Sequence, residues 1–233
     1  MSVTLTCTLY SIIELRVNMD ILYFGYVQTL LHETVGLVTI LNPVAAAAIM
    51  ISSSPSGLTK EDAGIIGRKT AITVLIASLL TVFFGNLIFE LFGINTSSIM
   101  VIGGIVLLLM SVHMVQGKIA HVNHSIEESE DTINKENISV IPIGIPILFG
   151  PGVISTLMIF KTNSIDFIEI VLLVCAVTIS TLIVYITLKN AILLTKVLGI
   201  TGLKVLTRIM GLVVGAIAAQ FIIHGSKVLW LST

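Results

Sequence analysis

Long stretches without a charged residue divide this chain into segments that could cross a membrane. Six stretches contain no Asp, Glu, Lys or Arg, and they run from Thr34 to Thr59, Thr70 to Phe89, Leu91 to Gly117, Asn137 to Phe160, Ile170 to Leu188, and Ile209 to Ser226. A transmembrane helix needs roughly 20 apolar residues, because each residue adds 1.5 Å across a core about 30 Å thick. Each stretch approaches or meets this length. We therefore predict an all-α membrane protein with six transmembrane helices.

The polar segments between these stretches organise the chain. We predict an N-terminal extension over residues 1–20, a first three-span repeat over residues 21–117, a polar loop over residues 118–136 and a second three-span repeat over residues 137–233. The loop contains five acidic residues and the pair His121 and His124. Such a pair could bind a metal, but a charge-rich loop is more often a water-facing connector, so we predict no metal site.

Composition and charge fit the membrane class. Charged residues make up 11% of the chain, against about a quarter in a soluble domain, and the net charge of -1 excludes a basic nucleic-acid binder. The loops after spans one, three and five hold nine basic residues: Lys60, Arg68, Lys69, Lys118, Lys135, Lys189, Lys196, Lys204 and Arg208. The opposite side holds Arg16, Lys161 and Lys227. Because cytoplasmic loops are enriched in Lys and Arg, we expect a multi-pass protein of the cytoplasmic membrane with both termini extracytoplasmic.

The two halves of the chain are similar to each other. A shift of 108 residues aligns Gly36 with Gly144, Pro43 with Pro151, Thr70 with Thr178, Gly103 with Gly211 and Gly117 with Gly225. Each half carries three spans, so the second half enters the membrane from the opposite side. This arrangement is the inverted-topology repeat found in many secondary transporters.

Two helix breaks fall at equivalent positions of these repeats. Asn42-Pro43 interrupts the first span, and Gly150-Pro151-Gly152 interrupts the fourth. Proline loses nothing at the first position of a helix, because its missing N–H would have no intrahelical partner there. We therefore predict broken helices 1 and 4, with Asn42 and Gly150 as N-caps and Pro43 and Pro151 as first helical residues. Both a full crossing and a re-entrant hairpin are compatible with the lengths.

A bound anion is the expected acceptor for N–H groups left unpaired at these breaks. Helix N-termini carry a partial positive charge that stabilises an anion by up to ~2 kcal/mol in partly buried sites. The groups expected to bind the substrate are the N–H groups of Ala45, Ala46, Gly152 and Val153 and the hydroxyls of Ser155 and Thr156. The alternative is that both breaks are proline kinks whose backbone groups are satisfied by neighbouring helices.

A coupling cation has two candidate locations in the sequence. Carbonyls freed before the breaks, over residues 39–41 and 147–149, could coordinate Na⁺ or help to relay H⁺. Glu33 and Glu90 could carry a coupling proton, although their positions near the span ends make this the weaker hypothesis. No other cofactor is expected.

Four segments resemble the MarC family of six-span membrane proteins. They are Asn42-Pro43-Val44, Gly103-Gly104, Ile143 to Thr156 and Thr201 to Gly225, and the likeness covers about residues 25 to 230. The resemblance implies a secondary transporter, and the small neutral amino acid transporters assigned to the family suggest the substrate class. This chain departs from the family in its first motif, where Ala45, Ala46 and Ala48 replace a glycine, a polar residue and a second proline.

We therefore predict a secondary transporter of small neutral amino acids, whose substrate carboxylate binds at the facing half-helix N-termini. An exporter or channel for another small solute or ion is the alternative. We do not expect an enzyme, because H-E-x-x-H and G-x-S-x-G motifs and paired membrane aspartates are missing from the sequence. The expected partners are the lipid bilayer and an amino-acid-like solute, with a homo-oligomer left open and no nucleic acid.

Overall fold

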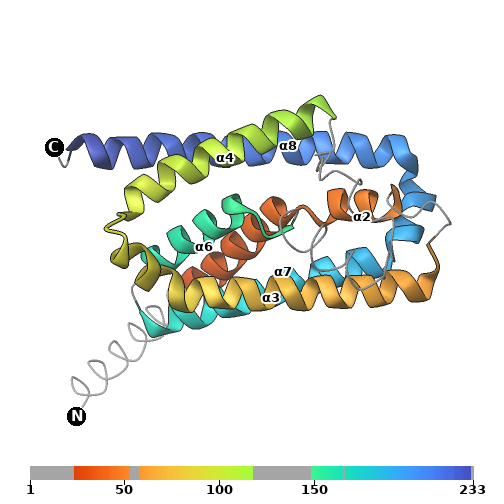
Figure 1. The fold of residues 1–233 in the computed structure, drawn as a ribbon, viewed down its shortest axis with the longest axis horizontal. Coiled ribbons are helices and arrows are strands. Elements are labelled where there is room, and N and C mark those ends of the chain that lie inside the picture. The colour runs from red at the N-terminus through yellow and green to blue at the C-terminus, as the bar shows by residue number, and fades with distance from the viewer. Residues whose placement is uncertain (1–23, 53–57, 118–147, 165, 232–233) are drawn as a thin grey trace, which may run out of the picture.

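The computed structural model describes residues 24–52, 58–117, 148–164 and 166–231, and within these ranges its regular structure is helical, without strands. A helix over residues 24–41 leads into α2. The labelled helices are α2 (Pro43–Ser52), α3 (Lys60–Leu91), α4 (Thr96–Gln116), α6 (Pro151–Asn163), α7 (Phe167–Lys189) and α8 (Ala191–Leu231). Figure 1 shows them as one elongated bundle.

Five of the described segments are long and apolar enough to cross a membrane: Phe24–Ile51, Lys60–Leu91, Thr96–Gln116, Phe167–Lys189 and Thr201–Leu231. The all-helical membrane class predicted from the sequence is therefore confirmed. The N-terminal extension, the polar loop with its two histidines and the first half of the predicted fourth span lie outside the described residues. Six spans and the inverted repeat consequently stay predictions.

The surface of the bundle is apolar, and its core combines apolar side chains with buried hydroxyl groups. Leu80, Phe83 and Leu87 of α3 are more than half exposed. The core contains large apolar side chains such as Leu37 and Leu107, and buried serine and threonine side chains, among them Thr70, Ser78, Ser111, Ser180 and Thr181. An apolar exterior of this extent is typical of a membrane or interaction surface, which agrees with the lipid environment predicted from the charge-free stretches.

Two pairs of long antiparallel helices form the outer layers of the bundle. The beginning of α3 lies against the end of α7, where a Cβ at Gly67 would be 3.1 Å from Leu188 Cβ. The beginning of α4 lies against the end of α8, where a Cβ at Gly225 would be 2.7 Å from the carbonyl oxygen of Ser97. Glycine permits this close approach of helix backbones.

The shorter helices lie between these two pairs. α2 contacts α7 and α8, whereas α6 contacts α3 and α4. Figure 1 shows the helix over residues 24–41 running beside α6, and α2 continuing onward in the same general direction. The first broken segment therefore runs through the bundle as a crossing segment rather than turning back as a hairpin.

Glycines with positive φ end helices at corresponding places in the two halves. Gly93 follows α3 with φ 65°, and Gly199 interrupts α8 with φ 65°. This left-handed conformation costs glycine little, because it lacks a Cβ. Residues 191–198 thus form a short helix of their own before the long helix from Thr201 to Leu231.

Candidate functional site

The first break is built by Asn42, which ends one helix and begins the next. Its N–H donates to the carbonyl of Val38 at 3.0 Å, and its φ of 45° turns the chain out of the preceding helix. Its side-chain oxygen then accepts from the N–H of Ala45 at 3.3 Å. Asparagine tolerates this conformation better than most residues and is also a favoured N-cap, so one residue ends the first helix through its backbone and caps the second through its side chain.

The second break begins α6 and uses no capping side chain. Gly150 is the N-cap with an extended backbone, and Pro151 follows in the first turn. The carbonyl of Gly150 accepts from the N–H groups of Val153 at 3.0 Å and Ile154 at 3.3 Å. The predicted roles of both N-caps and both prolines as helix starts are therefore confirmed by the geometry.

Both helix starts lie against α4 near the middle of the bundle (Figure 1). The side-chain nitrogen of Asn42 lies 3.8 Å from Met114 Sδ, and a Cβ at Gly152 would be 2.5 Å from Leu107 Cδ2. Leu107 and Met114 are seven residues apart, which is about 10 Å along α4. Gly152 also lies close to Ile40, at the end of the first half-helix. The structure therefore brings the two breaks into one region.

Most of the N–H groups assigned to an anion already have acceptors within the chain. Ala45 donates to the side chain of Asn42, Ala46 donates to the carbonyl of Asn42 at 3.2 Å, and Val153 donates to Gly150. The expectation that these three groups are unpaired is wrong, because each helix start satisfies them locally. The N–H groups of Val44 and Gly152 lie in the first turns of their helices, where no carbonyl of the same helix can accept their hydrogen bonds.

The hydroxyls of Ser155 and Thr156 are also engaged within α6. They donate to the carbonyls of Pro151 at 2.9 Å and Gly152 at 2.8 Å, respectively. Both side chains are buried, and a Cβ at Gly103 of α4 would overlap Ser155. Each hydroxyl can therefore still accept a hydrogen bond from a ligand, but it cannot donate one while its hydrogen bonds to the helix backbone.

The remaining residues of the predicted site surround these groups. Pro43, Ala46 and Val153 are buried, Ala45 is half-buried, and Pro151 is exposed. Because residue 43 is a proline, the carbonyl of Thr39 lacks the N–H that a continuous helix would supply. This carbonyl belongs to the group predicted to face a cation.

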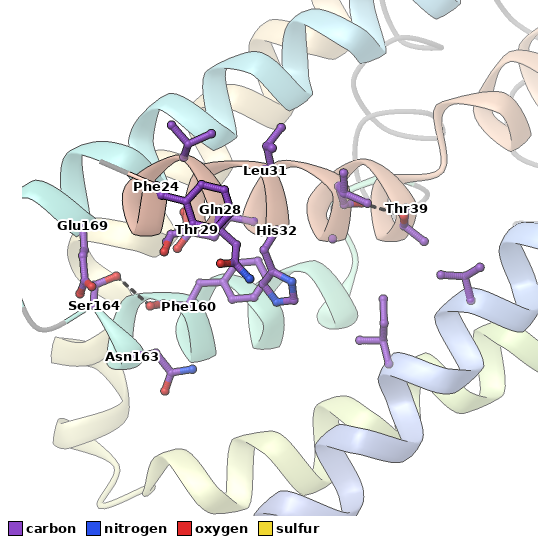
Figure 2. A pocket seen from close by; sticks show the side chains of 16 residues that line it. Phe24, Gln28, Thr29, Leu31, His32, Thr39, Phe160, Asn163, Ser164 and Glu169 are labelled. Atoms are coloured by element: carbon purple, nitrogen blue, oxygen red, sulfur yellow. Dashed lines mark hydrogen bonds between the residues drawn. The ribbon is translucent and has the colours of Figure 1, made fainter. Parts of the chain in front are cut away.

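A cavity of about 790 Å³ reaches into the bundle from the end at which residue 24 and the α6–α7 connection lie. Its walls come from the helix over residues 24–41, the end of α6, the beginning of α7 and α8. The polar side chains that line it include Gln28, His32, Glu33, Thr39, Asn163 and Glu169 (Figure 2). Its inner end at Thr39 lies one helical turn before Asn42.

Sequence reasoning did not foresee most of this cavity. Glu33 was a weak candidate, whereas Asn163 and Glu169 had no signal because they lie between the charge-free stretches that end at Phe160 and begin at Ile170. Figure 2 shows His32 beside the ring of Phe160, and their ring centroids are 6.0 Å apart. Tertiary packing alone brings these distant segments together.

Comparison with known proteins identifies the family. The chain matches the family described as "MarC family integral membrane protein" over residues 27–230. It is 36% identical to a UPF0056 membrane protein of Pyrococcus abyssi, covering 83% of this chain and 92% of that protein. A UPF0056 membrane protein of Methanocaldococcus jannaschii is 34% identical (81% and 91% covered), and YhcE of Escherichia coli is 30% identical (83% and 89%). No solved structure matches the chain. This chain is a member of the MarC family of integral membrane proteins.

Proposed function

We propose that this protein is a secondary transporter of small neutral amino acids in the cytoplasmic membrane. The observation that carries the proposal is the meeting of two interrupted helices against α4, with their N-termini in the middle of the bundle. Many transporters bind substrates where broken helices expose backbone N–H groups near the membrane centre. The 790 Å³ cavity provides an approach from one end of the bundle that is roomy enough for a small solute.

The proposed architecture is a pair of inverted three-span repeats. The contacts of α2 with α7 and α8 correspond to those of α6 with α3 and α4 when each helix is exchanged for its partner in the other half. The close approach of Gly117 to Arg208 likewise corresponds to that of Gly225 to Met100, since both pairs are related by the 108-residue shift. These exchanged contacts support a two-fold relation between the halves.

The proposed substrate carboxylate lies between Val44 and Gly152, whose N–H groups point out of the two helix starts. The nearby side chains of Ile40, Leu107 and Met114 are uncharged. A site without a charged side chain favours a solute with a neutral side group. Ser155 and Thr156, one turn into α6, offer acceptor oxygens to the substrate ammonium group.

The proposed orientation places both termini outside the cytoplasm. α3 begins at Lys60 and α7 ends at Lys189, and these two helix ends lie at the same end of the bundle because the helices are antiparallel. The cavity lies at the opposite end, near Asn163 and Glu169. In this orientation it faces the extracytoplasmic side.

Counterflow in proteoliposomes tests the transport proposal. Purified protein loaded with unlabelled alanine should take up labelled alanine, glycine or serine transiently and with saturation. Alaninamide, which lacks the carboxylate, should compete poorly. The proposal is overturned if none of the three amino acids exchanges, and linear, non-saturating flux would instead indicate a channel.

A backbone variant tests the location of the substrate. Val44→Pro removes the N–H of residue 44 in the first turn of α2, where proline is tolerated, and Val44→Ala is the matched control that keeps it. We expect Val44→Pro to lose stabilisation by alanine in thermal unfolding while Val44→Ala keeps it. Equal stabilisation of two folded variants would exclude this N–H from the site.

A further inference from the structure

Glu33 is a buried carboxylate with an unsatisfied oxygen. It lies in the segment Phe24–Ile51 and is only 5% exposed. Its Oε2 has no hydrogen-bond partner among the described residues. A buried ionised carboxylate without a partner is strongly unfavourable, so such groups bind a proton, a metal ion or a basic side chain.

The cavity offers neither Lys nor Arg to pair with Glu33 among the described residues. Its titratable lining residues are His32, Glu33 and Glu169, and neither Lys nor Arg lines it within the described part of the chain. His32 is exposed and packs near Phe160. Glu169 of α7 is close enough for its negative charge to act on Glu33. Two carboxylates around one cavity attract a cation.

Helix polarity adds to this negative potential. The last turn of α6 borders the cavity through Phe160 and Asn163, and the carbonyl end of a helix favours positive charge. Neutral oxygens of the lining, such as those of Thr29 and Ser164, are of the type that hard monovalent cations accept as ligands. Figure 2 shows Ser164 and Glu169 at the same end of the cavity.

Glu33 lies too far from the helix breaks to belong to the proposed substrate site. Glu33 and Asn42 are nine residues apart on one helix, which corresponds to about 13 Å. A small amino acid is too short to place its carboxylate at the breaks and its ammonium group at Glu33. A ligand that binds at Glu33 is therefore distinct from the proposed substrate.

We propose that Glu33, together with Glu169, binds the monovalent cation, H⁺ or Na⁺, whose gradient drives transport. This inference rests on the proposed function for its role in transport, whereas cation binding itself can be measured without transport. Binding of cation and substrate would then favour each other reciprocally, as linkage requires.

Separate exchange and accumulation measurements test the coupling. Proteoliposomes contain wild type, Glu33→Gln, or Glu61→Gln as the control that neutralises an exposed carboxylate at the beginning of α3. Exchange is measured with equal pH and Na⁺ on both sides, and accumulation with an inward H⁺ or Na⁺ gradient alone. The gradient that drives the wild type identifies the cation. We expect Glu33→Gln to keep exchange but to lose accumulation above the external concentration, and Glu61→Gln to keep both.

Accumulation by Glu33→Gln at the wild-type level would overturn the proposal. Absence of exchange in the wild type would refute the transport function instead, and the cation site would then be decided by thermal unfolding of the purified protein. We expect Na⁺ in place of choline, or a lower pH, to raise the melting temperature of wild type and Glu61→Gln but not of Glu33→Gln. Glu33→Asp, which retains the carboxylate, should retain the response. An equal response of Glu33→Gln to both conditions would refute cation binding at Glu33.

Discussion

The backbone of Asn42 provides the sharpest test of how the first helix break is held. Its φ of 45° lies in the left-handed region, which costs an ordinary L-residue roughly 1–2 kcal/mol. Its side chain also caps the N–H of Ala45, and replacing an asparagine N-cap by alanine costs about 1 kcal/mol. Asn42→Ala should therefore lower the free energy of unfolding by roughly 2–3 kcal/mol.

Asn42→Gly separates the two contributions. Glycine also removes the capping oxygen, but it adopts the left-handed conformation without strain and costs only a few tenths of a kcal/mol at an N-cap. We expect the glycine variant to be more stable than the alanine variant by about 1–2 kcal/mol. If the conformation of residue 42 were unimportant, the two variants would have equal stability.

The assay is reversible unfolding in mixed micelles, titrated with SDS and followed by circular dichroism. Equal midpoints for Asn42→Ala and Asn42→Gly would refute the left-handed conformation as the constraint on this residue. A large loss of stability in both variants would show instead that the contacts of the side chain, including the one with Met114, dominate.

Three further outcomes follow from the same contacts. Gly104→Ala should destabilise the protein by about 1–3 kcal/mol in SDS titration, because the added Cβ would lie 2.8 Å from the carbonyl oxygen of Ala218. Gly64→Ala is the control: its Cβ meets nothing within 4 Å, so the substitution should be neutral or stabilising. Gly103→Ala should be similarly destabilising, because its Cβ would overlap the side chain of Ser155. Adding Ser155→Gly removes that side chain and should restore part of the lost stability, and a double-mutant cycle measures this coupling. Asn42→Asp keeps the capping oxygen but places a carboxylate at a buried position, so both stability in SDS titration and alanine binding measured by calorimetry should fall.

The helix breaks could be predicted from the sequence because their causes are local. Proline lacks an N–H, and asparagine or glycine before it matches a helix start, wherever the segment lies. Pro43 and Pro151 therefore revealed two breaks without knowledge of any tertiary contact. The charge-free stretches are local in the same sense, since the bilayer acts on each segment separately.

The partners of the N–H groups could not be predicted in this way. Whether Ala45 faces a ligand or the side chain of Asn42 depends on one side-chain conformation and one φ angle. The cavity was further out of reach, because Glu33 and Glu169 come from different halves of the chain. Only the packing of the helix over residues 24–41 against α6 and α7 reveals that their charges share one space.

The position of α6 connects the two proposed sites. Its N-terminus begins at the second break, and its last turn lines the cavity that contains Glu33. Thirteen residues span about 20 Å, so one rigid helix has its positive end at the proposed substrate site and its negative end at the proposed cation site. A shift of α6 would change both sites at once. Because ligands at both ends would then favour the same position of the helix, α6 is the element through which a cation gradient could act on substrate affinity.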